Sequence, residues 1–289
     1  MSRTSTEPVF LTAADARRME AAEEYGAFRY ALALNFERPQ MGIAWEEFGG
    51  GHLVFVARRS PVGRAHGLGF AGEVTLEQIR HVEDFYFLRE ADAQIDVCPY
   101  AHQSLFEAVN QRGFQVAEFN QTLARWILPT EVFAPRSEGV EVRRLRGDEG
   151  SQWSSLLAKV FFEDQAPQFE MFFLPWTKDN NALCLGAFVD GQMIGGAGGL
   201  IVPEHKMAGF FGAGTLPEFR GRGIQLALMQ ERLRIVQQAG CDLAVTLTMP
   251  GTTSQRNVER AGFRTAYTKV VVVKRHPNSP EPIQVHYSE

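Results

Sequence analysis

An internal repeat constrains the fold of this chain more than any other feature of its sequence. Residues 93–128 and 241–275 each run through a strand, a turn with proline, a short helix, a Gly-Phe pair and an alternating strand. One such feature could recur by chance, whereas the whole ordered set indicates duplication of one structural unit. We therefore predict two similar halves.

The Gly-Phe pairs indicate where each short helix ends. Gly113 and Gly262 stand directly after the helical segments, at the position where a residue with positive φ commonly terminates a helix. Phe114 and Phe263 then begin the following strands, and we expect both rings to anchor those strands to the core. Each repeat thus predicts a helix that turns tightly into a strand.

The length and the repeat together predict two domains. A chain of 289 residues is long for one domain and sufficient for two. We assign residues 1–129 to an N-terminal domain and residues 139–275 to a C-terminal domain. Residues 130–138, which contain Pro and Ser and are followed by Gly139, are expected to be the linker, and residues 276–289, which are Pro-rich and polar, a C-terminal tail.

The order of strands and helices predicts an α/β (α+β) fold, with a mixed, mostly antiparallel sheet flanked by helices in each half. A long helical pattern over 224–240 separates two strands, which are expected to be parallel neighbours because a helix joins them. Asp190-Gly191 is a hairpin signal. The other expected elements are helices at 12–34, 76–91 and 150–162, a short helix at 167–176, and strands at 51–59, 64–74, 139–145, 183–191, 192–202 and 206–216.

Charge and cysteine usage narrow the range of partners. The net charge is −5, from 29 basic and 34 acidic residues, which argues against nucleic acid as the main partner. Cys98, Cys184 and Cys241 have no CxxC spacing, so reduced core thiols are expected rather than a metal site or disulfides. There is no signal-peptide pattern and no apolar run of about 18 residues, which predicts a cytoplasmic protein that does not contact membranes.

The segment PEFRGRGIQLALMQERL (217–233) crowds two glycines and two arginines between a proline and an amphipathic helix. A nucleic-acid site would be expected to repeat the Arg-Gly pair among aromatic residues, and this chain is acidic. A dinucleotide-binding turn could start at Gly212 and Gly214, but Pro217 stands where its third glycine should be.

A loop that holds a pyrophosphate at a helix start fits the same segment better. The preceding strand ends near Thr215, and a helix begins at Ile224, where unpaired N–H groups and the helix dipole favour an anion. Gly221 and Gly223 would let a phosphate approach the backbone. The loop by itself is equally compatible with a glycine turn that only reverses the chain.

Residues 220–225 resemble the acetyl-CoA loop of the GCN5-related N-acetyltransferase (GNAT) superfamily, [QR]-x-x-G-x-[GA], except that Gln225 replaces the small residue. Residues 254–263 resemble the last helix and the Gly-Phe pair of that family. The resemblance covers nearly all of 139–275 and is weaker in the N-terminal half, which has no such loop. It implies a tandem protein of two acyl-CoA N-acyltransferase-like domains, the first of them degenerate.

The resemblance also implies acetyl-CoA as co-substrate, without a metal. Backbone groups of a splayed strand would hold the pantetheine arm and polarise the thioester, and amides of the loop would bind the pyrophosphate. Ser254 and Asn257 would be further cofactor contacts, although capping and packing roles remain open for both. The other residues implied are Ala213, Gly214, Thr215, Arg220, Gly221, Arg222, Gly223, Ile224 and Gln225.

The catalytic groups of the family are less well matched. Many members use a Glu on the strand after the long helix as base and a Tyr in the last helix as acid, and here those positions hold Thr246 and Val258. Glu163 and Asp164, in the loop that borders the acceptor site in the family, and Tyr267 are the alternative candidates. A solvated acidic turn and an ordinary strand aromatic remain open for them.

The resulting prediction is an acetyl-CoA-dependent N-acetyltransferase that transfers the acyl group directly to an amine in a ternary complex, mainly by positioning. The alternatives are a non-catalytic acyl-CoA-binding or ligand-sensing protein, and a structural pair of degenerate domains. The acceptor could be a small molecule or a peptide, and a homodimer is compatible with the sequence. Neither the acceptor nor the preferred acyl chain is defined by the sequence.

Overall fold

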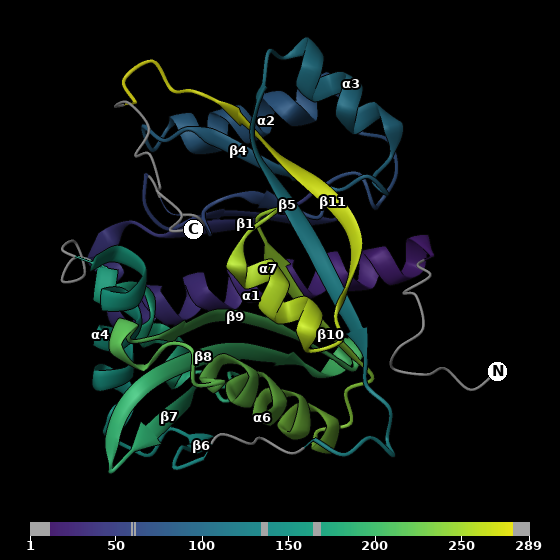
Figure 1. Ribbon diagram of the computed structural model, residues 1–289. Helices are drawn as coiled ribbons and strands as arrows, with labels where there is room; N and C mark the ends of the chain where they lie inside the picture. The colour runs from purple at the N-terminus through teal and green to yellow at the C-terminus, as the bar shows by residue number, and fades with distance from the viewer. Residues whose placement is uncertain (1–11, 59, 61, 134–137, 164–168, 280–289) are drawn as a thin grey trace. The chain divides into compact units, whose positions relative to one another are not determined.

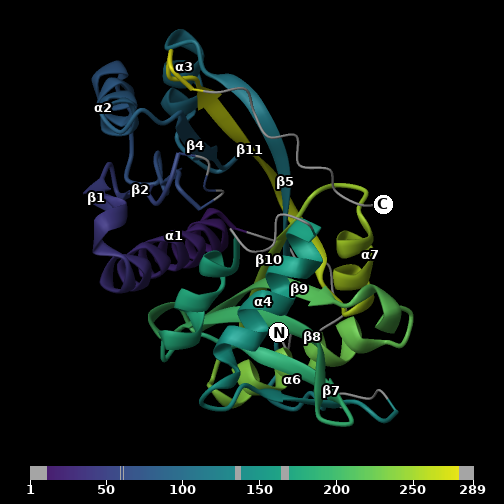
Figure 2. The ribbon, with the colours of Figure 1, turned by 90° about the vertical axis from the view of Figure 1, so that its left-hand side faces the viewer.

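The computed structural model describes residues 12–58, 60, 62–133, 138–163 and 169–279, and these divide into two compact units (Figures 1 and 2). Unit 1 holds the described residues of Leu123–Leu247 and Ser254–Arg264. Unit 2 holds those of Phe10–Thr122, Thr248–Thr253 and Thr265–Glu289. Both units are therefore built from more than one segment of the chain.

Two long strands cross the boundary between the units. Strand β11 (Arg264–Lys274) completes the second repeat, yet its residues from Thr265 onward belong to unit 2. Strand β5 (Gln115–Trp126) begins in unit 2 and ends in unit 1. The domain boundaries predicted from the sequence, 1–129 and 139–275, follow the order of the repeats, whereas the compact units divide these two strands differently. The extent of the two homologous halves stays a prediction.

Unit 1 contains a mixed sheet with the strand order β10-β9-β8-β7-β6. All neighbours in this order are antiparallel except β9 and β10, which are parallel as expected from the helix that joins them. The elements are β6 (Glu141–Arg144), α4 (Glu149–Phe162), η3 (Glu170–Phe172), η4 (Leu174–Lys178), β7 (Leu185–Val189), β8 (Gln192–Val202), η5 (Pro203–His205), β9 (Met207–Thr215), η6 (Pro217–Phe219), α6 (Ile224–Gln238), β10 (Leu243–Thr248) and α7 (Thr253–Arg260).

Helices α4 and α6 cover opposite faces of the unit 1 sheet. Successive residues of a strand point to opposite faces, and a Cβ at Gly195 would lie 3.4 Å from Ile224 of α6. A Cβ at the next residue, Gly196, would instead lie 2.6 Å from Nε1 of Trp153 in α4. Glycine at these two positions therefore lets both helices approach the backbone of β8.

In unit 2, neighbouring strands follow the order β1-β2-β3-β4-β11. The pair β3–β4 is parallel, and the other neighbours are antiparallel. Its remaining elements are α1 (Ala13–Glu37), η1 (Pro39–Met41), β1 (Ala44–Phe48), β2 (Gly51–Phe55), β3 (Ala65–His66), α2 (Leu76–Phe87), β4 (Ala93–Val97) and α3 (Gln103–Gln111).

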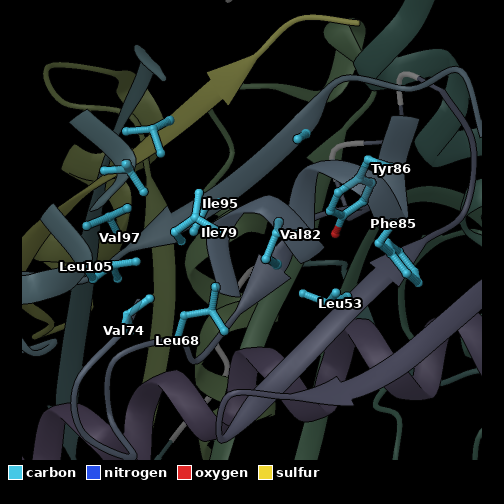
Figure 3. Close-up of a cluster of buried hydrophobic side chains, with 14 of the residues drawn as sticks. Leu53, Leu68, Val74, Ile79, Val82, Phe85, Tyr86, Ile95, Val97 and Leu105 are labelled. Atoms are coloured by element: carbon cyan, nitrogen blue, oxygen red, sulfur yellow. The ribbon is translucent and has the colours of Figure 1, made fainter. Parts of the chain in front are cut away.

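The apolar core of unit 2 lies between its sheet and the helices α2 and α3 (Figure 3). Ile95 and Val97 of β4 point into this core together with Ile79 and Val82 of α2 and Leu105 of α3. Because side chains alternate along a strand, the residue between the first two, Asp96, faces the other side of the sheet.

The structure confirms the repeated unit. Strand, helix and strand occur in the same order in β4–α3–β5 and β10–α7–β11. Gly113 and Gly262 have φ values of 77° and 88°, as expected for residues that end a helix. Phe263 is fully buried, and Phe114 is half-buried against the unit 2 core.

Two predicted elements differ from the structure, and one observed strand was not predicted. The strand expected at 64–74 is reduced to Ala65–His66, because Gly67 and Gly69 adopt φ values of 75° and 81° that end the pairing. The sequence AWEEF forms strand β1, which the pattern had not indicated. The described part of the short helix expected at 167–176 consists of the 3₁₀ segments η3 and η4, the second with Pro175 in its first turn.

Two smaller expectations, a hairpin and buried cysteines, agree with the structure. Asp190 and Gly191 both have positive φ and join β7 to β8 as a hairpin. Cys98, Cys184 and Cys241 are buried thiols, as expected. Across the described residues, the helices lack either the length or the apolar character that a membrane span requires.

Candidate functional site

In unit 1, strand β9 pairs with β10 along only part of its length. The parallel pairing joins Met207–Phe210 to Leu243–Thr246 and goes no further. At the last pair, the Thr246 hydroxyl donates a hydrogen bond of 2.9 Å to the Phe210 carbonyl. The five remaining residues of β9 run beside β8, so their other edge is not used by the ladder with β10.

A β-bulge accompanies this separation of β9 from β10. Gly196 of β8 pairs with Gly214, whereas Gly198 pairs with Phe211, so β9 has one more residue than β8 between these pairs. Gly212, inside the bulge, has a φ of 54°. A bulge bends its strand and increases its twist, which accounts for the departure of β9 from its neighbour at this point. We call Phe211–Thr215 the splayed segment.

A buried arginine on α6 supports the bulge. Arg232 is 2% exposed, and its Nη1 donates to the Gly198 carbonyl at 2.9 Å. Its guanidinium carbon lies 4.6 Å from the ring centroid of Phe210. Burial lowers the pKa of Arg232 to about 9. This cation therefore contacts both the bulge and the last residue of β9 that pairs with β10.

Glycine in the splayed segment permits close packing of α4. A Cβ at Gly214 would lie 2.7 Å from Cγ1 of Val160. Trp153 of the same helix is fully buried, and its indole N–H donates to the Leu185 carbonyl at 2.9 Å. The face of the splayed segment that meets α4 is therefore closely packed, while its free edge remains the side directed away from β8.

The glycine loop follows the splayed segment directly. After η6, residues 220–223 are exposed, and Gly221 and Gly223 have φ values of 78° and 75°. No atom lies within 4 Å of a Cβ placed on either glycine. Gly223 is the N-cap of α6 and provides no side-chain cap. The first N–H groups of α6, which have no partner within the helix, therefore begin beside an open surface.

Polar side chains connect the loop to the end of β9. The Gln225 amide donates to the Thr215 hydroxyl at 2.7 Å, and Arg220 Nε lies 3.4 Å from the Thr215 carbonyl. Arg222 lies over the ring of Phe219, 5.2 Å from its centroid. Gln225, which departs from the family pattern, thus links the first turn of α6 to the splayed segment.

The structure brings most of the predicted cofactor-binding residues together. Ala213, Gly214 and Thr215 are the last three residues of the splayed segment. Residues 220–225 follow after the short 3₁₀ helix η6 and lead into α6. Ser254 and Asn257 lie on α7, also in unit 1, where Ser254 is exposed and Asn257 is half-buried. No contact of theirs with the loop is recorded among the described residues, so their predicted role rests on the resemblance.

The three catalytic candidates are dispersed. Glu163 is exposed at the end of α4, with a φ of 46° that is unusual for a residue other than glycine. Asp164 lies outside the described residues. Tyr267 belongs to unit 2, where its hydroxyl donates to Oε1 of Glu20 at 2.6 Å, and burial together with Glu20 raises its pKa far above the usual range. Catalytic roles for them stay predictions.

Unit 2 holds a buried ionic network that the sequence analysis did not find. Nζ of Lys269 in β11 lies 2.6 Å from Glu23, 3.3 Å from Glu20 and 3.4 Å from Asp96. Burial alone would lower the pKa of Lys269, but the three carboxylates raise it well above its usual value. The ammonium group thus has one carboxylate for each of its three N–H donors.

Asp96 connects this lysine to two further cations of unit 2. His66 Nδ1 lies 3.0 Å from its carboxylate, and Arg64 Nη1 lies 3.4 Å from it. Burial opposes ionisation, yet Lys269, His66 and Arg64 hold the pKa of Asp96 well below its usual value. Glu23, His66 and Asp96 could form a metal-ligand set by their spacing, but the Lys269 ammonium lies between two of these ligands.

The sequence comparison identifies a known family in unit 1. The sequence model of the Acetyltransferase (GNAT) family matches residues 149–263. This range begins with α4 and includes the splayed segment, the glycine loop and α7. No curated protein matches the chain.

Solved structures resemble the fold over more of the chain. A GCN5-related N-acetyltransferase from Kribbella flavida is 17% identical, with a TM-score of 0.64 over 91% of this chain and 96% of that one. A tandem GNAT protein from the clavulanic acid biosynthesis pathway is 13% identical, with a TM-score of 0.56 over 93% and 98%.

A further match, a GCN5-related N-acetyltransferase from Sphaerobacter thermophilus, is 20% identical with a TM-score of 0.52, and covers 68% of this chain but only 65% of that protein. At these identities the matches establish a shared fold. The family match shows that residues 149–263 form a domain of the Acetyltransferase (GNAT) family.

Proposed function

We propose that the chain is an acetyl-CoA-dependent N-acetyltransferase whose cofactor site lies in unit 1. The observation that carries this proposal is the direct succession of the splayed segment and the uncapped start of α6. The pyrophosphate of acetyl-CoA needs an anion site, and its pantetheine arm, which ends in the thioester, needs an unused strand edge. These two features follow one another within residues 211–225. GNAT membership supports acyl transfer in general, whereas the acceptor and the mechanism belong to the proposal.

The loop fits a pyrophosphate by its own geometry. The open space above Gly221 and Gly223 would admit phosphate oxygens, and a Cβ at either position would intrude on it. The first amides of α6 and the positive end of its dipole would bind the charge. Backbone groups of Ala213, Gly214 and Thr215 would bind the pantetheine arm along the free edge of β9.

The chemistry requires an amine nucleophile at the thioester that acetyl-CoA supplies. In this proposal, unit 1 contributes mainly by orienting the two reactants and by excluding water from the attack. Thr246 and Val258, at the positions of the family's base and acid, have no side-chain group that titrates near neutral pH. The Thr246 hydroxyl is in addition engaged by the Phe210 carbonyl, and Val258 is buried.

The presence of threonine and valine at positions 246 and 258 favours a second candidate function. If no other group removes the amine proton, the chain could bind acyl-CoA without turnover and act as a ligand sensor. Both candidates require cofactor binding, and only the enzyme acetylates an amine. A panel of amines incubated with acetyl-CoA and the purified chain therefore separates them, with release of free CoA thiol as the signal.

The first experiment is a calorimetric titration of the purified chain with acetyl-CoA. We expect a dissociation constant in the micromolar range, about −8 kcal/mol, and a loss of at least about tenfold in the variant Gly223→Glu, because a carboxylate there would repel the pyrophosphate. The matched control is Gly191→Glu, which adds the same charge at an exposed glycine with a φ of 80° in the β7–β8 hairpin. Absence of binding by the wild type, or equal loss in both variants, would refute the cofactor site.

A further inference from the structure

We infer that the acceptor is an arylamine, a weakly basic amine on an aromatic ring, and that a group of phenylalanines in unit 1 binds its ring. This inference rests on the proposed function, since it names the acceptor of the same site. The aromatic cluster consists of Phe161, Phe162, Phe169, Phe172 and Phe173, from the end of α4, η3 and the residues around them.

The rings of the aromatic cluster lie against one another. Phe162 and Phe169 stack with 3.9 Å between their centroids and an interplanar angle of 14°. Phe169 also stacks on Phe172 at 5.5 Å, and Phe161 on Phe173 at 5.9 Å. Flat aromatic faces at such spacing favour further planar rings in offset-stacked or edge-to-face contact.

The aromatic cluster remains open to solvent. Phe161 is 46% exposed, and the other four phenylalanines are half-buried, while Trp153 beneath Phe173 is fully buried. A cluster that served only as core would be buried like this tryptophan. Apolar side chains that contact one another and stay partly exposed leave surface on which a ligand could pack.

The aromatic cluster reaches the splayed segment. A Cβ at Gly212, the bulge residue, would lie 3.5 Å from Cε1 of Phe173 and 3.9 Å from Leu157. Helix α4, which carries Phe161 and Phe162, packs against β9 (Figure 2). The cluster therefore borders the strand along which we propose that the thioester lies, so a ring bound there would present its substituent to the acyl group.

The groups available for proton transfer favour a weakly basic amine. An alkylamine is an ammonium ion at neutral pH and must lose a proton before it attacks. An arylamine is neutral at that pH, because its lone pair is delocalised into the ring, and apolar surroundings disfavour the charged form still more. With threonine and valine at positions 246 and 258, an arylamine, which is neutral before it binds, is the acceptor that these two positions favour.

The transfer step balances without any further reactant. The amine nitrogen bonds to the carbonyl carbon, and the bond between that carbon and the CoA sulfur breaks. The sulfur leaves with the bonding pair, and the proton lost from nitrogen goes to it, which gives an N-aryl acetamide and CoA thiol. An alkylammonium ion could also lie over the aromatic faces, but it carries no free lone pair and would inhibit instead of reacting.

The first arm of the test compares two acceptors of similar size. The purified full-length chain is incubated with acetyl-CoA and either aniline or cyclohexylamine, and the product is measured between pH 6 and 9. We expect kcat/KM for aniline to be at least about tenfold higher at pH 7, and nearly constant with pH. Equal or better use of cyclohexylamine, or no acetanilide despite bound acetyl-CoA, would overturn the inference.

The second arm measures binding without turnover. Acetanilide, the product, is titrated calorimetrically into the chain saturated with CoA. We expect about tenfold weaker binding in Phe161→Ser, and no change in the control Phe36→Ser, which alters an 89% exposed phenylalanine of α1 in unit 2. Unchanged binding in Phe161→Ser would overturn the inference.

Acetyl-CoA titration of the same proteins keeps the two proposals distinct. If the wild type does not bind acetyl-CoA, the proposed function fails. If it binds acetyl-CoA but neither binds acetanilide nor acetylates aniline, only the inference about the acceptor fails. Melting temperatures of both variants establish that each protein is folded.

Discussion

Within the described residues, a parallel strand pair occurs in each unit, β9–β10 in unit 1 and β3–β4 in unit 2, and the two pairs end in opposite ways. In unit 1, β9 and β10 share four residue pairs, after which β9 separates and leads into the glycine loop. In unit 2, the single pair Ala65–Ile95 is followed at once by His66 and Asp96, whose side chains bind one another at 3.0 Å. The same point of the repeated architecture is thus open in one unit and joined by ionic side chains in the other.

The difference shows how one fold can serve binding and structure. A ligand needs a strand edge and N–H groups that the protein itself does not use, and unit 1 leaves both beside its loop. Unit 2 places Lys269, His66 and Arg64 around Asp96 at the corresponding level of its sheet. Buried ionic groups stabilise little in net terms but strongly penalise the loss of any one partner, which suits a structural role.

The largest effect is expected from Lys269→Met in unit 2. This change would leave the buried Glu20 and Asp96 and the partly exposed Glu23 without their shared cation, at a cost of about 3–5 kcal/mol in the free energy of unfolding. Urea denaturation measures it. Lys274→Met, on the same strand, removes a partly exposed ion pair with Glu83 and should cost about 1 kcal/mol or less.

A milder variant keeps this test informative if Lys269→Met does not fold. Tyr267→Phe removes only the hydroxyl that donates to Glu20, and should lower the free energy of unfolding by about 1–2 kcal/mol. A cost near zero for both variants would mean that the network does not stabilise unit 2, and the contrast between the units would lose its basis.

The opposite sign is expected from Arg232→Met in unit 1. Arg232 is buried, and burial alone accounts for its lowered pKa, so removing its charge should leave the free energy of unfolding unchanged or raise it by about 1–3 kcal/mol. Because the bulge would lose its contact at Gly198, acetyl-CoA binding should weaken, and Arg232→Lys should restore part of it. A destabilised variant with normal acetyl-CoA affinity would contradict this role.

The smallest effect concerns a partly exposed pair at the start of α4. A hydrogen bond from Arg143 lowers the pKa of Glu149 from 4.5 to about 2. Since the folded value lies below the unfolded one, the pair stabilises the fold above about pH 4.5, and this contribution disappears as the pH falls towards 2. We expect Glu149→Gln to cost about 1 kcal/mol at pH 7.

Urea denaturation of wild type and Glu149→Gln at a series of pH values tests this sign. The difference between the two should shrink between pH 4.5 and pH 2, because other carboxyl groups titrate equally in both proteins. A difference that stays constant over this range would show that the stabilisation does not depend on the charge of Glu149.

Local signals made much of unit 1 predictable from the sequence. Gly262 marked the end of a helix, and Gly221 and Gly223 marked an open loop before α6, because a positive φ and the absence of a side chain are properties of single residues. The bulge was not predicted. It depends on the register between β8 and β9, which the run of glycines at 195–199 leaves unspecified.

The network of unit 2 was missed because its members are far apart in the sequence. Glu20 and Lys269 are separated by 249 positions and meet only in the folded chain. Asp96 stands between Ile95 and Val97, and Lys269 precedes a run of four valines, so charged residues inside apolar strands were the available signal. The sequence did not predict that β11 belongs to unit 2 from Thr265 onward, because its alternating pattern fits the strands of either unit.

Because β11 belongs to unit 2 from Thr265 onward, it also affects when that unit can fold during synthesis. A nascent chain emerges from its N-terminal end and folds by domains where it can. Glu20, Glu23 and Asp96 emerge long before Lys269, whereas the strands β6–β10 of unit 1 emerge together. The N-terminal part of unit 2, which is translated first, can therefore complete its ion pairs only after β11 has been translated. A chain that ended before Lys269 would hold the three carboxylates of Glu20, Glu23 and Asp96 without the lysine that pairs with them.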